Sequence, residues 1–191
     1  MRFARTGNAG AELNNHHQER LRMPTMQELR DTLPQQGRVV WIGLRPERRA
    51  TPVTVDSVEV TTADGLVGDH YKSRLKTRQV TLIQGEHLDA VASILGIAAV
   101  DPGLIRRNVV VRGINLLALK DKHFRVGTTV LEFCEPCHPC SLMEANLGPG
   151  GYNAMRGHGG ITARVIEGGT IRVGDAVALQ EPQQAAAAMQ D

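Results

Sequence analysis

The sequence has few aromatic residues, little net charge and no long apolar run. Phe, Trp and Tyr make up 3% of its 191 residues, so single-stranded nucleic acid would lack the ring platforms on which bases stack. The net charge of +2 is too small to indicate a nucleic-acid partner. No apolar stretch approaches the roughly 18 residues of a spanning helix, and residues 1–22 contain no apolar segment of a secretory signal. We therefore expect a cytoplasmic protein with neither a nucleic-acid nor a membrane partner.

The remaining composition is that of one globular domain with polar ends. Hydrophobic residues make up 41% and charged residues 22% of the chain, as in ordinary globular domains. We expect an N-terminal tail and short helix over 1–35, the domain over 36–181, and a flexible tail over 182–191. Thr25 and Glu28 have the spacing of a capping box, and Pro34 and Gly37 should end the helix that it begins.

Short β-branched runs predict that the domain is mainly β. We expect strands at 39–44, 53–61 (with a bulge at Asp56-Ser57), 79–84, 108–111, 128–133, 163–167, 170–173 and 176–179. Residues 86–95 have helical spacing, and Gly96 should end that helix. Gly168-Gly169 predicts a hairpin turn. Many short strands joined by turns, with a few short helices, indicate a closed or nearly closed β-barrel.

The three cysteines lie within seven residues, Cys134 to Cys140, directly after the strand expected at 128–133. Pro136 and Pro139 restrict the backbone, which predicts a stiff loop. Because cytoplasmic thiols stay reduced, a disulfide framework is not expected. Four interpretations remain: a structural zinc site without its second ligand pair, an iron–sulfur cluster without its fourth cysteine, buried apolar side chains, or one open thiolate that binds a soft metal or carries sulfur. We favour the open thiolate.

Candidate anion-binding features lie on both sides of this loop. Arg106 and Arg107, followed by Asn108, open a strand, and guanidinium groups pair with two phosphate oxygens at once. The glycine-rich segments 148–152 and 157–160 can expose N–H groups to anions, although tight turns explain the same glycines. His158 between glycines is a candidate general acid, and a turn hydrogen bond explains it equally well.

In this order the segments resemble MOSC domains, a family named for the C-terminal domain of molybdenum cofactor sulfurases. The resemblance runs from about residue 37 to residue 179. The matching segments are GLVGDH at 65–70, RQVTLI at 78–83, EHL at 86–88, RRNVVV at 106–111, CHPC at 137–140, GHGGI at 157–161 and GTIRVGD at 169–175. Each motif is loose, but their shared order is specific. The resemblance implies a fold similar to the barrel domain of pyruvate kinase and a molybdenum cofactor of the molybdopterin type.

The resemblance also implies roles for individual residues. Cys140 is expected to be the metal ligand or, in a member that carries sulfur, the sulfur-accepting thiol. Contacts with the cofactor are expected from Thr77, Arg78, Arg106, Arg107, Asn108 and His138. It gives Cys134 and Cys137 no role.

Three functions follow as hypotheses. The first is an enzyme that reduces an N-hydroxylated or otherwise oxidised nitrogen substrate at molybdenum bound by Cys140, with His158 supplying a proton and a partner protein the electrons. The second is a carrier of persulfide sulfur or mature cofactor that serves a cofactor-biosynthesis partner without turnover. The third is a structural zinc module. The chain holds neither the N-terminal β-barrel domain that accompanies MOSC in amidoxime-reducing enzymes nor a sulfurase domain, so we expect a more open site, cofactor transfer, or a homodimer that completes the site.

Overall fold

The computed structural model describes residues 23–71 and 75–180. These residues belong to two units, and along the chain the first ends at Leu33 and the second begins at Pro34. The first unit contains one short helix, α2 (Met26–Asp31). Its predicted capping box is confirmed: the Glu28 N–H donates to Thr25 Oγ1 at 3.2 Å, and the Thr25 N–H donates to the Glu28 carboxylate at 2.6 Å. The other elements belong to the second unit.

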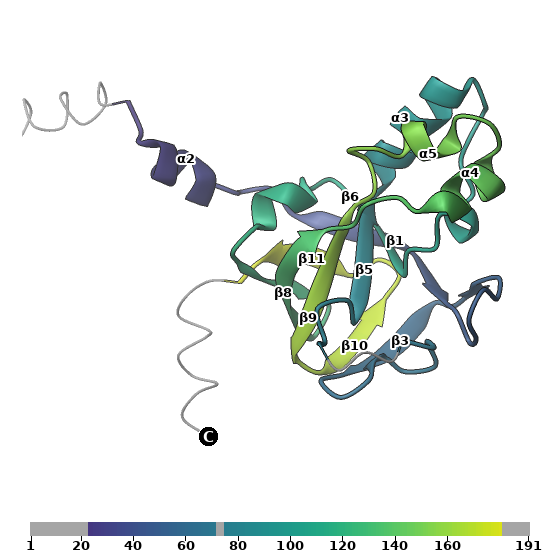
Figure 1. Ribbon diagram of the computed structural model, residues 1–191. Helices are drawn as coiled ribbons and strands as arrows, with labels where there is room; N and C mark the ends of the chain where they lie inside the picture. The colour runs from purple at the N-terminus through teal and green to yellow at the C-terminus, as the bar shows by residue number, and fades with distance from the viewer. Residues whose placement is uncertain (1–22, 72–74, 181–191) are drawn as a thin grey trace, which may run out of the picture. The chain divides into compact units, whose positions relative to one another are not determined.

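The second unit is built on a closed barrel of seven strands (Figure 1). In order around the barrel, the strands are β1 (Gly37–Leu44), β6 (Val109–Arg112), β5 (Val80–Gln84), β9 (Ile161–Glu167), β8 (Thr129–Pro136), β7 (His123–Val126) and β11 (Ala176–Leu179). The barrel closes where β11 pairs again with β1, with Gly37 opposite Val177. The β5–β6 pair is parallel, and the other neighbours are antiparallel. The prediction of a mainly β, closed barrel with a few short helices is confirmed.

A three-stranded sheet accompanies the barrel and corrects two local expectations. It contains β3 (Ser57–Thr61), β4 (Gly65–Leu66) and β10 (Gly169–Arg172), whereas β2 (Val53–Thr54) pairs with the end of β1. The single strand expected at 53–61 is therefore wrong, because its two halves pair with partners in different sheets. The predicted hairpin is also wrong: β9 and β10 lie in different sheets, and Gly168 is the residue between them.

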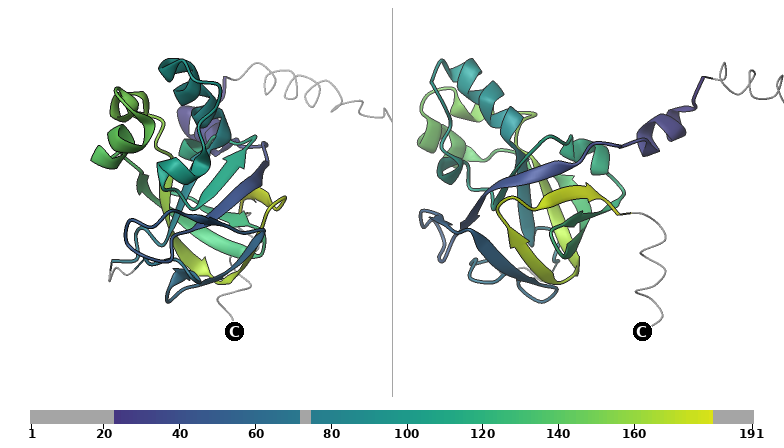
Figure 2. Two further views of the ribbon diagram at one scale, coloured as in Figure 1. Left: turned by 90° about the vertical axis from the view of Figure 1, so that its right-hand side faces the viewer. Right: turned by 180° about the vertical axis from the view of Figure 1, so that it is seen from behind.

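Helices cover the outer face of β5 and β6. Parallel neighbours require a crossover connection, and α3 (Gly85–Leu95) with the 3₁₀ turn η1 (Pro102–Ile105) provides it. Gly96 ends α3 in the left-handed conformation at φ 67°, as predicted. Two helices that the sequence did not predict, α4 (Ser141–Leu147) and α5 (Gly151–Ala154), gather with α3 at one end of the barrel (Figures 1 and 2).

Apolar side chains fill the space between these helices and the barrel. The cluster consists of Ile83, Leu88, Val91, Ala92, Val100, Ile105, Val110, Met143, Ala154 and Met155. Because this cluster covers the outer face of β5 and the barrel interior covers its inner face, all five residues of β5 are buried.

A second 3₁₀ turn, η2 (Leu116–Leu119), lies between β6 and β7. The sequence did not predict this turn. Within the described ranges, no helix is long and apolar enough to cross a bilayer.

Candidate functional site

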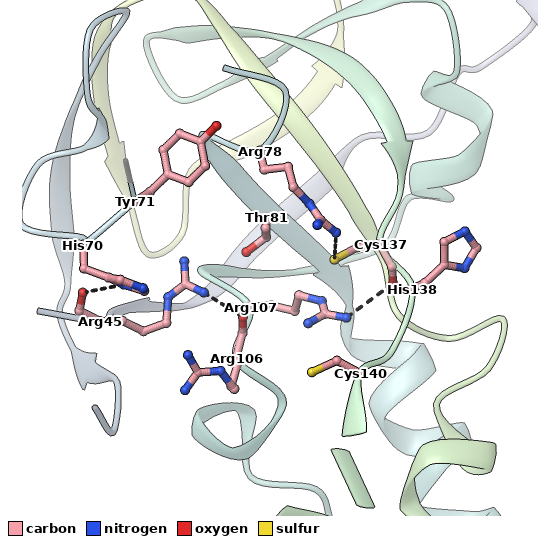
Figure 3. Close-up of a pocket in the computed structure, with 10 residues that line it drawn as sticks. All are labelled: Arg45, His70, Tyr71, Arg78, Thr81, Arg106, Arg107, Cys137, His138 and Cys140. Atoms are coloured by element: carbon pink, nitrogen blue, oxygen red, sulfur yellow. Dashed lines mark hydrogen bonds between the residues drawn. The ribbon is translucent and has the colours of Figure 1, made fainter. Parts of the chain in front are cut away.

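A cavity of about 440 Å³ opens beside the end of β8 (Figure 3). Segments that follow β1, β4, η1 and β8, together with the beginning of β5, supply its lining. The lining residues are Arg45, His70, Tyr71, Arg78, Thr81, Arg106, Arg107, Cys137, His138 and Cys140. Four of them are arginines, two are histidines and none is acidic. The cavity is therefore suited to an anion.

Arg45 is fixed at the wall of this cavity by Asp69, whose side chain is 0% exposed. Asp69 Oδ1 accepts hydrogen bonds from the Arg45 backbone N–H at 2.7 Å and from Nε at 3.1 Å, and Oδ2 accepts one from Nη2 at 2.8 Å. A buried carboxylate is stable only when it is paired and hydrogen-bonded, and this fork-like pairing meets both needs. Asp69 thus balances the charge of Arg45 and leaves the other arginines without a buried counter-charge.

Arg107 is the most buried of the four arginines, with 6% of its surface exposed. Its guanidinium group donates to the backbone carbonyls of Gly159 at 2.7 Å, Ile105 at 3.0 Å and Cys137 at 3.3 Å. Burial is the main cause that lowers its pKa, while Cys137 and then Cys140 act in the opposite direction. Arg107 therefore joins three chain segments and places a positive charge beside the two cysteines of the cavity.

Arg106 has different surroundings although it is the neighbour of Arg107 in sequence. Within residues 23–71 and 75–180, its side chain makes no hydrogen bond or ion pair. Its backbone has a φ of 59°, in the left-handed region that non-glycine residues rarely adopt. Burial, and next the charge of Arg45, lowers the pKa of Arg106. A bound anion would stabilise the charged guanidinium and so offset both effects. Arg106 is therefore the arginine most available to a ligand.

Cys134 lies outside this cavity. The strand β8 continues to Pro136, which pairs with Ile161, so the expectation that all three cysteines share one stiff loop is wrong for Cys134. The residue is half-buried, and burial, followed by the charge of Glu132, raises the pKa of its thiol. This placement makes Cys134 the least suited of the three to form a thiolate.

Cys137 and Cys140 both line the cavity but differ in accessibility. Cys137 is buried, with its Sγ 3.9 Å from Nη2 of Arg78. Cys140 is exposed, immediately precedes α4, and points into the space bordered by Arg106 and Arg107 (Figure 3). Cys140 is therefore the thiol that a ligand in the cavity reaches.

The segment 157–160 packs against the cysteine loop through its backbone. The Cys137 N–H donates to the Gly160 carbonyl at 2.8 Å. A Cβ atom on Gly159 would collide with the carbonyl oxygen of Cys137, and one on Gly160, whose φ is 81°, would collide with that of Leu82. These glycines thus permit a close backbone approach, and the segment does not line the arginine-rich cavity.

The structure brings together many of the residues expected from the sequence, but not all of them. Those that line the cavity are Arg78, Arg106, Arg107, His138 and Cys140. Thr77 is exposed and lies outside the lining. Asn108 is 0% exposed, and its amide is occupied by Thr81, whose hydroxyl donates to Oδ1 at 2.7 Å, and by the Gly43 carbonyl at 3.2 Å from Nδ2. The role of each of these residues toward a cofactor stays a prediction.

His158 does not line this cavity either. Its ring is half-buried and stands edge-on to His87, with 5.0 Å between the ring centroids. Its proposed role as a proton donor stays a prediction. Two other histidines, His70 and His138, belong to the lining of the cavity, but the ring of His138 points away from Arg106, Arg107 and Cys140 (Figure 3). Nδ1 of His70 lies 3.2 Å from the Arg45 carbonyl oxygen.

Sequence reasoning did not assign Arg45, His70, Tyr71 or Thr81 to the site. His70 ends the segment GLVGDH and Thr81 lies within RQVTLI, so both were inside motifs that carried the family resemblance. The motifs therefore contained these two residues, but whether their side chains face the cavity depends on how the strands pair, which the motifs do not reveal.

The zinc hypothesis gains no support. Within the part of the chain that the structure describes, no three His, Cys, Asp or Glu side chains are placed to hold a metal ion together. This finding does not bear on a metal that is bound by one cysteine of the protein and takes its other ligands from a cofactor, because such a metal needs no cluster of three protein side chains.

Comparisons with known proteins bear on the family and the fold. A sequence model described as "MOSC domain" matches residues 67–178. Among solved structures, the YUAD protein from Bacillus subtilis is 16% identical with a TM-score of 0.63, over 78% of this chain and 98% of that chain. YiiM from Geobacillus stearothermophilus is 19% identical with a TM-score of 0.62, over 76% of this chain and 75% of that one. YiiM from Escherichia coli is 19% identical with a TM-score of 0.56, over 75% and 70%. At these identities the structures show a shared fold alone, and no curated protein matches the sequence.

Proposed function

Because the chain belongs to the MOSC domain family, we propose that it binds a molybdenum cofactor of the molybdopterin type, with Cys140 as the protein ligand of the metal. The observation that carries this proposal is an exposed thiol in a cavity that four arginines and no acidic residue line. Soft metals select thiolate ligands, and guanidinium groups match the oxygens of a phosphate. The donor set of this cavity therefore fits a cofactor that carries both.

Three of the four arginines have different parts in holding such a cofactor. Arg106, which has no partner of its own among the described residues, binds the phosphate. Arg107 is held by backbone carbonyls, so it contributes a fixed positive charge without having to reorganise. The charge of Arg45 is balanced by Asp69, so Arg45 adds little net charge. When bound, the cofactor supplies a two-electron redox centre.

We propose the reduction of an N-hydroxylated compound as the reaction of this site. The balance is R–NHOH + 2 e⁻ + 2 H⁺ → R–NH₂ + H₂O, and a partner protein supplies the electrons. His70 borders the cavity, and its imidazole is the candidate proton donor to the leaving oxygen.

The first test is cofactor content after expression with molybdate. Wild-type protein should purify with stoichiometric molybdenum and should release a fluorescent oxidised pterin. Cys140→Ser should lose molybdenum, whereas Cys134→Ser, a matched change outside the cavity, should keep it. Arg106→Met should lose pterin, whereas Arg172→Met, at an exposed position on β10, should not. Equal molybdenum in wild type and Cys140→Ser would contradict the proposal.

A carrier of sulfur is the second candidate, and the exposure of Cys140 favours it. Mass spectrometry of the non-reduced protein separates the two functions. One extra sulfur atom on Cys140 without bound pterin indicates the carrier. Oxidation of a reduced viologen dye that depends on an N-hydroxylated substrate and on Cys140 indicates the enzyme.

A further inference from the structure

A second cavity, of about 140 Å³, adjoins the first. Both cavities are lined by Cys137 and His138, so the cysteine loop forms a wall between them. The second cavity has a different chemistry: its apolar lining comes from Leu116, Leu117, Pro136, Pro139 and Ile161, and no arginine, lysine, aspartate or glutamate contributes. It is therefore unsuited to the anion that the first cavity fits.

His87, from the first turn of α3, is one of the few polar side chains of this lining. Its Nδ1 is buried and has no hydrogen-bond partner among the described residues, and the same is true of Nδ1 of His158 beside it. A buried polar atom without a partner is destabilising. In the position described, Nδ1 is closed off from the cavity that the His87 side chain lines. A half-turn of the ring about its Cβ–Cγ bond exchanges Nδ1 with Cδ2, and this turn is what a ligand in the cavity needs in order to pair with Nδ1.

The surroundings of His87 favour the neutral imidazole. Burial, and next the charge of His158, lowers the pKa of His87, and the charge of Glu86 acts in the opposite direction. A neutral imidazole accepts a hydrogen bond at one ring nitrogen and donates one at the other. A charged ligand would be buried here without a counter-charge, at a large cost in free energy.

We propose that this cavity is a second ligand site, which takes a small uncharged ring compound whose hydroxyl or imino group shares a hydrogen bond with His87. Apolar cavities of about 150 Å³ hold a benzene-sized molecule, so the volume suits a single ring. This site is separate from the cofactor cavity, and the inference does not depend on the proposed function. A ligand bound here contacts the same loop that carries Cys140.

The experiment is a titration of the whole protein with phenol, toluene and benzoate, followed through its backbone amide resonances at slightly alkaline pH. Phenol should shift the amides of Gly157, Gly159 and Ile161 to saturation. It should bind about tenfold more tightly than toluene, the ratio expected for one hydrogen bond. Benzoate should bind more weakly than phenol. An absence of saturable shifts at these amides, or tighter binding of benzoate, would overturn the proposal.

Two variants and a control sharpen this test. His87→Leu should abolish the preference for phenol over toluene, whereas His123→Leu, an exposed position on β7, should preserve it. Leu117→Trp should fill the cavity and abolish binding of both compounds, and the side chain it replaces is 46% exposed, so the fold should tolerate it. Unchanged phenol binding in Leu117→Trp would refute the site even if His87→Leu failed to fold.

Discussion

Replacing Arg107 with methionine should destabilise the protein strongly, whereas the same change at Arg106 should not. Arg107 donates to the carbonyls of Gly159, Ile105 and Cys137. Methionine fills a similar volume but donates nothing, so the substitution leaves buried carbonyls without a donor. Arg106 makes no such contact within the described ranges, and its loss should cost little.

The magnitude follows from the contacts. An unsatisfied buried acceptor costs about 1–3 kcal/mol, so three of them give an upper range of about 3–9 kcal/mol. The variant also removes a buried positive charge, whose desolvation opposes folding in the wild type. The two effects have opposite signs, and we expect a net loss of about 3 kcal/mol in the free energy of unfolding.

Equilibrium unfolding in urea measures this difference. Arg107→Met should lower the denaturation midpoint at an unchanged slope, and Arg106→Met should lie within about 0.5 kcal/mol of the wild type. Arg106→Gly should be more stable than the wild type by up to about 1 kcal/mol, because glycine adopts the left-handed conformation without strain. Equal stability of Arg107→Met and Arg106→Met would refute the structural role assigned to Arg107.

Three further predictions concern other parts of the site. Gly160→Ala should lower the free energy of unfolding by about 2–4 kcal/mol, because its φ is positive and a Cβ would collide with the Leu82 carbonyl; thermal unfolding checks this. Iodoacetamide should alkylate Cys140 well before Cys134, since burial raises the pKa of the Cys134 thiol and leaves less thiolate; peptide mass spectrometry follows both. His87 has a pKa below its ordinary value of 6.5 in the folded protein, so the unfolded chain takes up the proton first as the pH falls. As the pH falls from the unfolded to the folded pKa of His87, the free energy of unfolding should therefore decrease. His87→Leu should flatten that part of the profile of unfolding free energy against pH.

Each of these has a clear contrary result. A Gly160→Ala variant as stable as the wild type would mean that the backbone approach at this position is not tight. Equal alkylation rates of Cys134 and Cys140 would contradict their different burial. A stability–pH profile of His87→Leu that parallels the wild type would show that His87 keeps its ordinary pKa on folding.

Local patterns in the sequence predicted the elements whose causes are local. The capping box at Thr25 and Glu28 and the glycine stop at Gly96 both depend on residues a few positions apart, and both are present. Runs of β-branched residues predicted most of the strands, and their number indicated a barrel. The order of the motifs indicated the family, the spacing of the cysteines drew attention to their loop, and the resemblance to the family singled out Cys140.

Tertiary structure alone decided which of these residues share a cavity and which are exposed. Arg45 and Arg106 are far apart in sequence, and pairing of β1 with β6 brings the ends of their segments together. Asn108 and Cys137 are buried because segments from elsewhere in the chain pack against them, as the segment 157–160 does at Cys137, whereas Cys140 stays exposed. Propensity acts over a few residues, whereas burial and side-chain direction are set by pairing between distant segments, and it is burial and direction that make a binding site.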